Sequence, residues 1–418
     1  MLNNNYICAL DIGASKIAAV VVKIKRKRIT DIFFEATPSK GIKRGAIIDS
    51  AELTSAVGRA LKNLKVKSGI NIKFVYVNIS GQDIITKHSH AIIPLAERGN
   101  KVVTLSDIQN VNEQARILGS SLEDEIIHQI PFGYSIDSRS NVLNPLGLYS
   151  HRLEVDLYLI SGKASSVQTL TRVVNQAGYE IKDLFFSGIA TSNAVFNKEL
   201  QGGVNVLCDI GSDITEVLIY RNGMLKNIEI LPIGGNDLTL QLSDELRIPF
   251  DLAEDVKRSY ASIGDYSRIN EDKEILVKKD TGYKAIKQRL VAEMITSKAK
   301  LICQTIRDAV ENITPCNKID DFIATGRTIL IEGFLEMLEN TLGTQVKLGR
   351  IVHPDIAPIL NREDALSGQK YLTYVTSLGI VCQALHLEQP RFLSISQPPR
   401  NPILKAINKV KEVYQEYF

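Results

Sequence analysis

Two apolar stretches of the chain each lead into an Asp-Ile-Gly triplet and are followed by a second, mostly β-branched stretch. The first copy has an apolar run over Tyr6–Leu10 and a β-branched run over Ile17–Val22. Short apolar runs of this kind are typical of strands that are buried on both faces. The second copy, at residues 204–220, repeats the same order of strand, triplet, small or polar residues and strand. The pattern predicts two strand–turn–strand hairpins about half a chain apart.

The turn of the first hairpin carries side chains that suit a phosphate and a metal ion. Gly13 permits a tight turn and leaves room for a ligand beside the backbone. Ser15 and Lys16 offer hydrogen-bond donors to phosphate oxygens, and Asp11 ends a buried strand where it can hold a hydrated divalent cation. Alone, this stretch is equally compatible with an ordinary glycine-containing hairpin and a solvated lysine. The second copy favours two similar domains that hold one triphosphate and its metal between their turns.

The segment after the first hairpin predicts an α/β unit, because strands and a helix follow one another. Asp49 or Ser50 can cap the helix, whose apolar residues recur at helical spacing. The elements expected here are a strand at Ile29–Ala36, a helix at Ala51–Leu64 and a strand at Phe74–Ile79.

Residues 82–162 have a different pattern and predict a small α+β module inserted into the first domain. Ser106–Gln109 matches a capping box that opens a helix up to about Leu118. The strands expected in this module are Ile84–Thr86, Ala91–Ile93 and Arg152–Ile160.

The second half of the chain predicts another α/β unit with a helical subdomain. Asn222-Gly223 is the favoured pair for a type I′ hairpin turn. A charged stretch at 264–284 is expected to be a flexible connection. The main elements expected are helices at 251–262 and 285–313, a strand at Asp321–Thr325, and helices at Leu330–Leu342 and Tyr371–Leu387.

The last residues predict a linker and a detached amphipathic helix. Residues 388–400 contain three prolines and show no periodicity, whereas 401–418 begin with Asn-Pro, a helix-start signal. A helix of this length spans only ~27 Å and is charged along its length, so it is expected to lie in a membrane interface. It could instead pack on its own domain or on another subunit. The expected lipid-binding residues are Ile403, Leu404, Ile407, Val410, Tyr414, Tyr417 and Phe418, with Lys405 and Lys409 near anionic headgroups.

Composition narrows the classes of function. The net charge of +3 over 418 residues gives no indication of nucleic-acid binding. The polar N-terminus leads directly into a strand, so no signal peptide is expected, and no apolar run is long enough for a membrane span. The five cysteines lack metal or disulfide spacing and are expected to be reduced core residues of a cytosolic protein.

With these motifs in order, the chain resembles the actin-like ATPases, and within them the FtsA family of bacterial cell-division proteins. The resemblance extends over nearly the whole chain. It depends on Ala9–Lys16, Asn144–Val155, the second hairpin, Phe322–Gly326 with Glu332–Phe334, and the terminal amphipathic helix. It implies an actin-like two-domain α/β fold with an FtsA-type inserted α+β subdomain and a C-terminal amphipathic helix. The implied divisions are 1–81 with 163–203 (subdomain 1A), 82–162 (1C), 204–240 with 316–387 (2A), 241–315 (2B), 388–400 (linker) and 401–418 (membrane-targeting helix).

The resemblance also implies ATP and Mg²⁺ between the two halves. Asp11 and Asp209 would hold the metal through water. The phosphates would lie near Gly13, Ser15, Lys16, Gly211 and Ser212, and the adenosine near Glu254, Lys257, Arg258, Gly326 and Arg327. The spacing of Glu254, Lys257 and Arg258 on one helix face is also that of an ordinary surface ion pair.

Three departures from the family pattern bear on catalysis. Arg327 replaces a second glycine, so it must turn outward or stack on the base. Asp213 is expected to bring negative charge near the γ-phosphate. Ser187-Gly188 replaces a Glu-Pro pair whose glutamate is a candidate for orienting the attacking water. The chain is therefore expected to bind ATP and to be, at most, a slow ATPase.

The resemblance implies a protein that polymerises into actin-like protofilaments at the cytoplasmic face of the cell membrane, at the division site. It would tether the FtsZ ring by binding the FtsZ C-terminal tail around residues 241–315, and it would recruit later division proteins. Two alternatives remain open: a membrane-associated pilus-assembly scaffold of the same fold, and an actin-fold sugar kinase or chaperone ATPase. No sugar-site motif or C-terminal β-rich domain supports the second.

Overall fold

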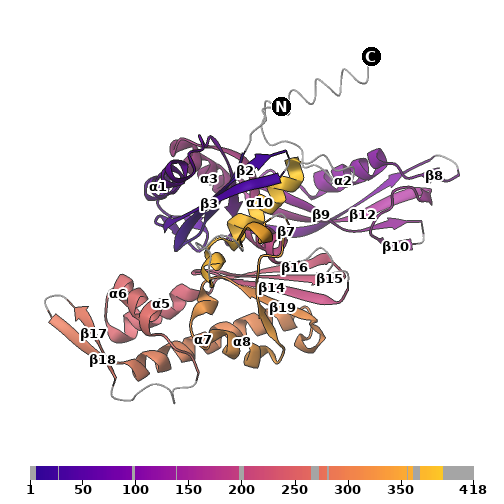
Figure 1. Cartoon of the computed structure of the whole chain (residues 1–418). Coiled ribbons are helices and arrows are strands. Elements are labelled where there is room, and N and C mark those ends of the chain that lie inside the picture. Colours follow the sequence, from indigo (N-terminus) through magenta and orange to yellow (C-terminus); the bar gives the residue numbers. More distant parts are fainter. Residues whose placement is uncertain are drawn as a thin grey trace.

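The computed structural model describes residues 6–26, 28–96, 99–137, 139–196, 202–264, 273–279, 282–354, 356–360 and 368–388. Figure 1 shows two halves, each built on a sheet, one above the other, with a third unit extending from the upper half. The predicted linker and terminal helix, beyond Glu388, lie outside the described residues.

The upper half is built on a sheet with the strand order β13-β6-β1-β2-β3. The helices α1 and α3 cover one face, and α4 and α10 contact the sheet from the other. The predicted first hairpin, third strand and helix are confirmed. The elements are β1 (Tyr6–Ile12), β2 (Lys16–Lys25), β3 (Arg28–Pro38), β4 (Ile42–Lys43), β5 (Ala46–Ile47), α1 (Ser50–Ser68), β6 (Phe74–Ile79), α3 (Ala164–Gln176), β13 (Glu180–Phe186), α4 (Ser187–Val195) and α10 (Val375–Glu388).

The lower half repeats the arrangement of the first sheet. Its strand order is β16-β15-β14-β19-β20. β14 pairs antiparallel with β15 and parallel with β19, as β1 does with β2 and β6. The predicted internal repeat is thus present in three dimensions. The elements are β14 (Val204–Ile210), β15 (Thr215–Arg221), β16 (Met224–Leu231), α5 (Gly235–Leu246), α6 (Phe250–Tyr260), α7 (Gln288–Glu311), β19 (Asp321–Thr325), α8 (Phe334–Leu342), β20 (Val346–Leu348) and α9 (Ala357–Leu360), with short 3₁₀ turns at Cys316–Lys318, Thr328–Leu330 and Lys370–Thr373.

The third unit is a four-stranded antiparallel sheet, β10-β9-β12-β7, with helix α2 packed on it. It has its own hydrophobic core, and a two-stranded ribbon, β11-β8, lies beside it. The elements are β7 (Ile84–Pro94), β8 (Lys101–Val102), α2 (Leu105–Gly119), β9 (Asp124–Ile136), β10 (Arg139–Val142), β11 (Tyr149–Ser150) and β12 (Arg152–Lys163).

Two expectations for this unit were wrong. The two short strands expected at Ile84–Thr86 and Ala91–Ile93 are one strand, β7, because β12 pairs with it along its whole length. The capping box starts at Thr104, not at Ser106: Thr104 and Asp107 exchange the two hydrogen bonds of the box.

The expectation for residues 264–284 was also wrong where the structure describes them. The strands β17 (Glu274–Lys279) and β18 (Gly282–Lys287) form an antiparallel hairpin. Within it, Ile275 and Val277 are buried. Alternating apolar residues within a charged stretch therefore make a strand with one buried face. As a result, α7 begins at Gln288, three residues after the predicted start.

All five cysteines are unpaired and buried, as expected. None of the described helices is both long enough and apolar enough to cross a membrane.

Candidate functional site: a cavity between two hairpins

A cavity of about 300 Å³ lies where the two hairpin turns meet. Both turns are closed in the same way: the Gly13 amide donates to the carbonyl of Lys16, and the Gly211 amide to that of Ile214, each at 2.9 Å. A Cβ at position 211 would lie 2.8 Å from the Ile214 carbonyl oxygen, so this turn requires glycine. All seven residues predicted to surround the phosphates and metal line this cavity: Asp11, Gly13, Ser15, Lys16, Asp209, Gly211 and Ser212.

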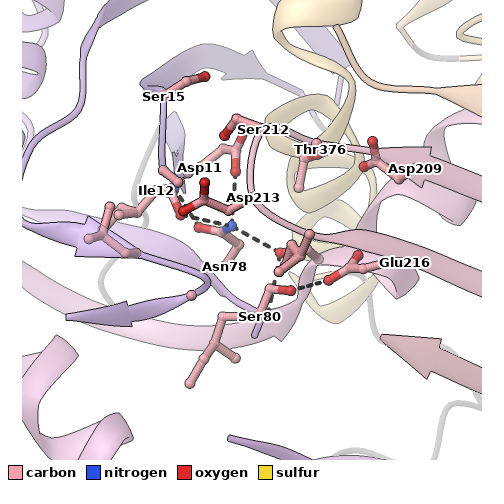
Figure 2. A pocket seen from close by; sticks show the side chains of 18 of the residues that line it. Asp11, Ile12, Ser15, Asn78, Ser80, Asp209, Ser212, Asp213, Glu216 and Thr376 are labelled. Atoms are coloured by element: carbon pink, nitrogen blue, oxygen red, sulfur yellow. Dashed lines mark hydrogen bonds between the residues drawn. The ribbon is translucent and has the colours of Figure 1, made fainter. Parts of the chain in front are cut away.

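Asp11 is held by a network that sequence reasoning missed. Asn78, at the end of β6, is 4% exposed. Its Nδ2 donates to Oδ1 of Asp11 and to Oγ of Ser187, both at 2.9 Å, and its Oδ1 accepts from the Ile12 amide at 2.6 Å (Figure 2). Asn78 therefore fixes the end of β1 against the start of α4. A polar residue inside the apolar run Phe74–Ile79 was the available signal.

Lys16 lies in the cavity but already has partners. Its Nζ donates to Oδ2 of Asp11 at 3.1 Å and to the carbonyl oxygen of Thr373. A phosphate in the cavity would have to compete with these acceptors or share the ammonium group with them.

Asp209 and Glu216 are acidic groups on neighbouring strands, at paired positions of β14 and β15. Burial, and then the charge of Asp11, raise the pKa of Asp209 to about 6. Burial, and then the charge of Asp209, raise the pKa of Glu216 to about 8. Carboxyl groups with raised pKa values in a cleft are typical of functional sites.

Glu216 was missed as a site residue, although a glutamate within the β-branched run of β15 was a visible signal. It is 3% exposed. Its Oε1 accepts a hydrogen bond from Oγ of Ser80, which lies across the cavity in the upper half (Figure 2).

Asp213 lines the cavity, but its carboxylate has partners of its own. Oδ2 accepts from the Arg44 amide and Oδ1 accepts from Nδ2 of Asn236, both at 2.7 Å. The first of these hydrogen bonds joins the lower hairpin to the loop between β4 and β5 of the upper half. The negative charge of Asp213 is therefore partly balanced by the dipoles of the backbone amide and the side-chain amide that donate to it.

The five predicted adenosine residues fall into two groups. Gly326 and Arg327 line the cavity. Gly326 has φ +92°, and a Cβ there would lie 2.2 Å from the Ile210 carbonyl oxygen, so no other residue fits. Glu254, Lys257 and Arg258 are not among the lining residues.

The second group forms a compact ion cluster on α6. Oε2 of Glu254 lies 2.6 Å from Nζ of Lys257, and its Oε1 lies 2.7 Å from Nε of Arg258. Lys257 is 8% exposed, and its Nζ also donates to the carbonyl of Gly235 at 2.9 Å and to Oγ1 of Thr239 at 2.7 Å. Lys257 thus joins α6 to the first turn of α5. Burial, and then the charge of Arg258, lower the pKa of Arg327.

The donor set suits a hydrated magnesium ion better than a caged metal. Among the residues described, no three His, Cys, Asp or Glu side chains are grouped to hold a metal ion. Asp11 and Asp209 line one cavity and are close enough for the charge of one to raise the pKa of the other. Mg²⁺ keeps several waters and is usually bound through one or two carboxylates plus substrate phosphates. These two carboxylates fit that pattern.

Two family models match the chain. The one described as "Cell division protein FtsA" matches residues 206–377, and "SHS2 domain inserted in FTSA" matches residues 81–161. The second match falls on the unit formed by β7–β12 and α2.

Curated relatives match over most of their length. The cell division protein FtsA of Bacillus subtilis is 25% identical over 383 residues, which cover 91% of this chain and 84% of the relative. That of Borreliella burgdorferi is 25% identical over 353 residues (83% and 85%). That of Buchnera aphidicola is 28% identical over 359 residues (84% and 85%).

Solved structures share the fold. A PilM–PilN type IV pilus biogenesis complex matches with a TM-score of 0.63 at 17% identity, covering 92% of this chain and 99% of that chain. MreB5 of Spiroplasma citri bound to AMPPNP matches with a TM-score of 0.50 at 13% identity, covering 98% and 99%. The predicted actin-like α/β fold with an inserted subdomain is confirmed.

Proposed function

This chain belongs to the FtsA family of cell division proteins, and we propose from this premise that it binds ATP and tethers the FtsZ ring to the membrane. The observation that carries the ATP proposal is the cavity between two matching Asp-Gly hairpins. A ligand held by both turns would stabilise the closed arrangement of the two halves by mass action.

In the proposed complex, the turn amides and the side chains of Ser15, Lys16 and Ser212 bind the phosphates. Gly13 and Gly211 let the phosphates approach the backbone. Asp11 and Asp209 hold Mg²⁺ through water, and the metal neutralises charge between these carboxylates and the phosphates. The neighbouring fold of MreB5 was solved with AMPPNP, which supports a nucleoside triphosphate as the ligand.

The proposed adenosine site lies at the Gly326 end of the cavity. Gly326 leaves the backbone open to the purine, and the guanidinium of Arg327 can stack on a base. Glu254, Lys257 and Arg258 would then face the ribose from the side of α6. In the described structure they instead hold α5 and α6 together, so their role in binding is a proposal that substitution at Lys257 would test.

We propose self-association into actin-like protofilaments as the link between ATP binding and membrane attachment. A single interfacial helix such as 401–418 gives only weak membrane binding. Many helices on one polymer gain by avidity. The protein would then lie at the cytoplasmic face of the membrane, at the division site, on anionic lipid.

The FtsZ C-terminal tail is proposed to bind the helical subdomain of the lower half, around residues 241–315. Large apolar side chains stand exposed on its helices, and the tail is proposed to contact them. These side chains are Phe250, Tyr260, Leu290 and Leu301. Leu240, on α5 directly before this range, is exposed as well. The protein would also recruit later division proteins.

Titration with a fluorescent ATP analogue in Mg²⁺ tests the central proposal. Asp209→Ala is expected to weaken binding about tenfold, because one of two metal-holding carboxylates is lost. Asp255→Ala removes an exposed carboxylate from α6 and serves as the control, with unchanged affinity expected. Equal affinities of the parent and Asp209→Ala would contradict the assignment of the second hairpin.

A further inference from the structure

The turn between β2 and β3 carries cations at the end of the upper sheet that is farthest from the cavity. β1 reaches the cavity at Asp11, and its other end, Tyr6, pairs with Lys23 on β2. The turn follows Lys23 directly, so it lies beyond the end of β1 that is opposite to the cavity. The exposed cations of the turn are Lys25, Arg26 and Arg28.

Two further exposed cations, Lys73 and Lys182, lie at the same end of the sheet. The hydroxyl of Tyr6 accepts a hydrogen bond from the Lys73 amide, and the Lys73 carbonyl accepts one from the Glu180 amide, each at 2.9 Å. The starts of β6 and β13 are thereby held beside the start of β1. We call this set of side chains the basic edge: Lys23, Lys25, Arg26, Arg28, Lys73 and Lys182.

The positive charge of the basic edge is not balanced by carboxylates. Among the residues that the structure describes, no carboxylate forms an ion pair with Lys25, Arg26 or Arg28. Two carboxylates lie at this end of the sheet: Asp31, which is opposite Lys23 in the register of β2 and β3, and Glu180, at the start of β13. The basic edge therefore keeps a surplus of positive charge at the surface.

Helix α10 runs from the cavity toward the basic edge. Thr376, in its first turn, lines the cavity, and the helix packs along β1 and β2 of the upper sheet (Figure 1). Leu385, near its other end, belongs to the same hydrophobic cluster as Ile7. Ile24 and Ile29, which flank the basic turn, pack against that cluster. The last described helix thus ends on the side of the basic edge.

The chain beyond α10 contains the linker at 388–400 and the proposed membrane helix at 401–418. A linker of this length spans at most about 45 Å when it is fully extended. The membrane helix would therefore hold the upper half close to the bilayer, with the basic edge on the side from which the linker leaves. Cations held near an anionic leaflet are attracted to it within a Debye length.

We propose that the basic edge binds anionic lipid headgroups and is a second membrane contact beside the terminal helix. This inference rests on the membrane attachment proposed above. Stable attachment generally requires two weak signals, such as one apolar anchor and one polybasic surface. Contact through the basic edge also orients the molecule, because the cavity and the lower half lie at the opposite end of β1 from the bilayer.

Flotation of the full chain with phosphatidylcholine vesicles, prepared with and without phosphatidylserine, tests the charge requirement. A variant with Lys25→Gln, Arg26→Gln and Arg28→Gln is expected to bind the phosphatidylserine vesicles at least about tenfold more weakly, since each cation contributes about fivefold. Its AMPPNP affinity should be unchanged, because none of the three residues lines the cavity. Lys25→Arg, Arg26→Lys and Arg28→Lys together keep the charge and should retain binding.

The matched control removes the same charge from exposed positions of the lower half. It combines Arg247→Gln, Lys300→Gln and Lys318→Gln. Arg247 has φ +53°, close to the φ of +51° at Arg26, so both variants change one arginine in a left-handed turn. This control is expected to bind vesicles like the parent.

A second measurement locates the contact. The chain has no tryptophan, so Thr30→Trp, next to the basic turn on β3, introduces a single indole at an exposed position. Its fluorescence should be quenched by vesicles whose headgroups carry a spin label. Tyr283→Trp, which replaces an exposed residue of the lower half, should not be quenched.

Several results would overturn the basic edge and leave the terminal anchor intact. These are equal vesicle binding by the parent and the glutamine variant, an equal loss in the lower-half control, a loss in the variant that keeps the charge, or equal quenching at both tryptophans. Tighter binding of a single-stranded RNA than of vesicles, lost in the glutamine variant, would assign the surface to nucleic acid instead. A parent that does not bind phosphatidylserine vesicles overturns both proposals.

Discussion

Glu216 is expected to lower the stability of the empty protein at neutral and alkaline pH. Its carboxyl titrates at about 8 in the folded state, against an ordinary value of 4.5. Between these values the folded state keeps a proton that the unfolded chain has released, so stability falls as pH rises from 4.5 to 8. Below 4.5 the group is protonated in both states and contributes nothing.

The magnitude follows from the size of the pKa change. Each pH unit in this window costs about 1.4 kcal/mol, which gives about 3 kcal/mol at pH 7 and about 4 kcal/mol at pH 8. Glu216→Gln has nearly the same shape and no charge to desolvate. We therefore expect it to be more stable than the parent by about these amounts, and nearly equal to it at pH 4.5.

Urea unfolding at pH 4.5, 7 and 8 measures the difference in unfolding free energy between Glu216→Gln and the parent. The unfolding is followed by far-UV circular dichroism, because the chain has no tryptophan. Glu229→Gln provides the matched change outside the cavity and is expected to show no such pH-dependent gain. A Glu216→Gln variant that is no more stable than the parent at pH 8 would refute the reasoning. Higher stability of Glu216→Gln at pH 7 and 8 would show that the protein retains this carboxyl group at a cost to its stability, as expected for a functional position.

Two further predictions concern the network around Asp11 and the terminal segment. Asn78→Ala should lower the free energy of unfolding by about 2–4 kcal/mol, because it leaves the buried Ile12 amide and Oδ1 of Asp11 without a partner. Asn63→Ala, which removes an exposed amide bonded to Glu35, is the control in the same urea titration, and equal losses would contradict this account. Deletion of residues 401–418 should abolish co-sedimentation with anionic liposomes, because it removes the seven apolar side chains expected to bind lipid, together with three lysines. Continued sedimentation of the truncated chain would disprove the anchor.

Local patterns predicted the elements that position the site. The apolar runs into Asp11 and Asp209 gave both hairpins, because a strand buried on both faces requires a continuous apolar run. The regular spacing of apolar residues gave α1, and a short apolar run gave β19. Failures occurred where a partner far away in sequence decided the outcome: β7 is continuous because β12 pairs with it throughout, and the β17–β18 hairpin buries alternate residues in a charged stretch.

The amino-acid sequence by itself determined the two hairpin turns that line the cavity, since each Asp-Ile-Gly triplet ends an apolar run and Gly211 is required by the turn that it forms. Tertiary structure alone decided which groups meet across the two halves. Asn78, Ser80 and Glu216 are polar residues in or beside apolar strands, and no local pattern distinguishes them from isolated buried polar residues. They form one site because packing places the end of β6 opposite β15. Burial in that contact, a property of the folded chain, also raises the pKa of Glu216.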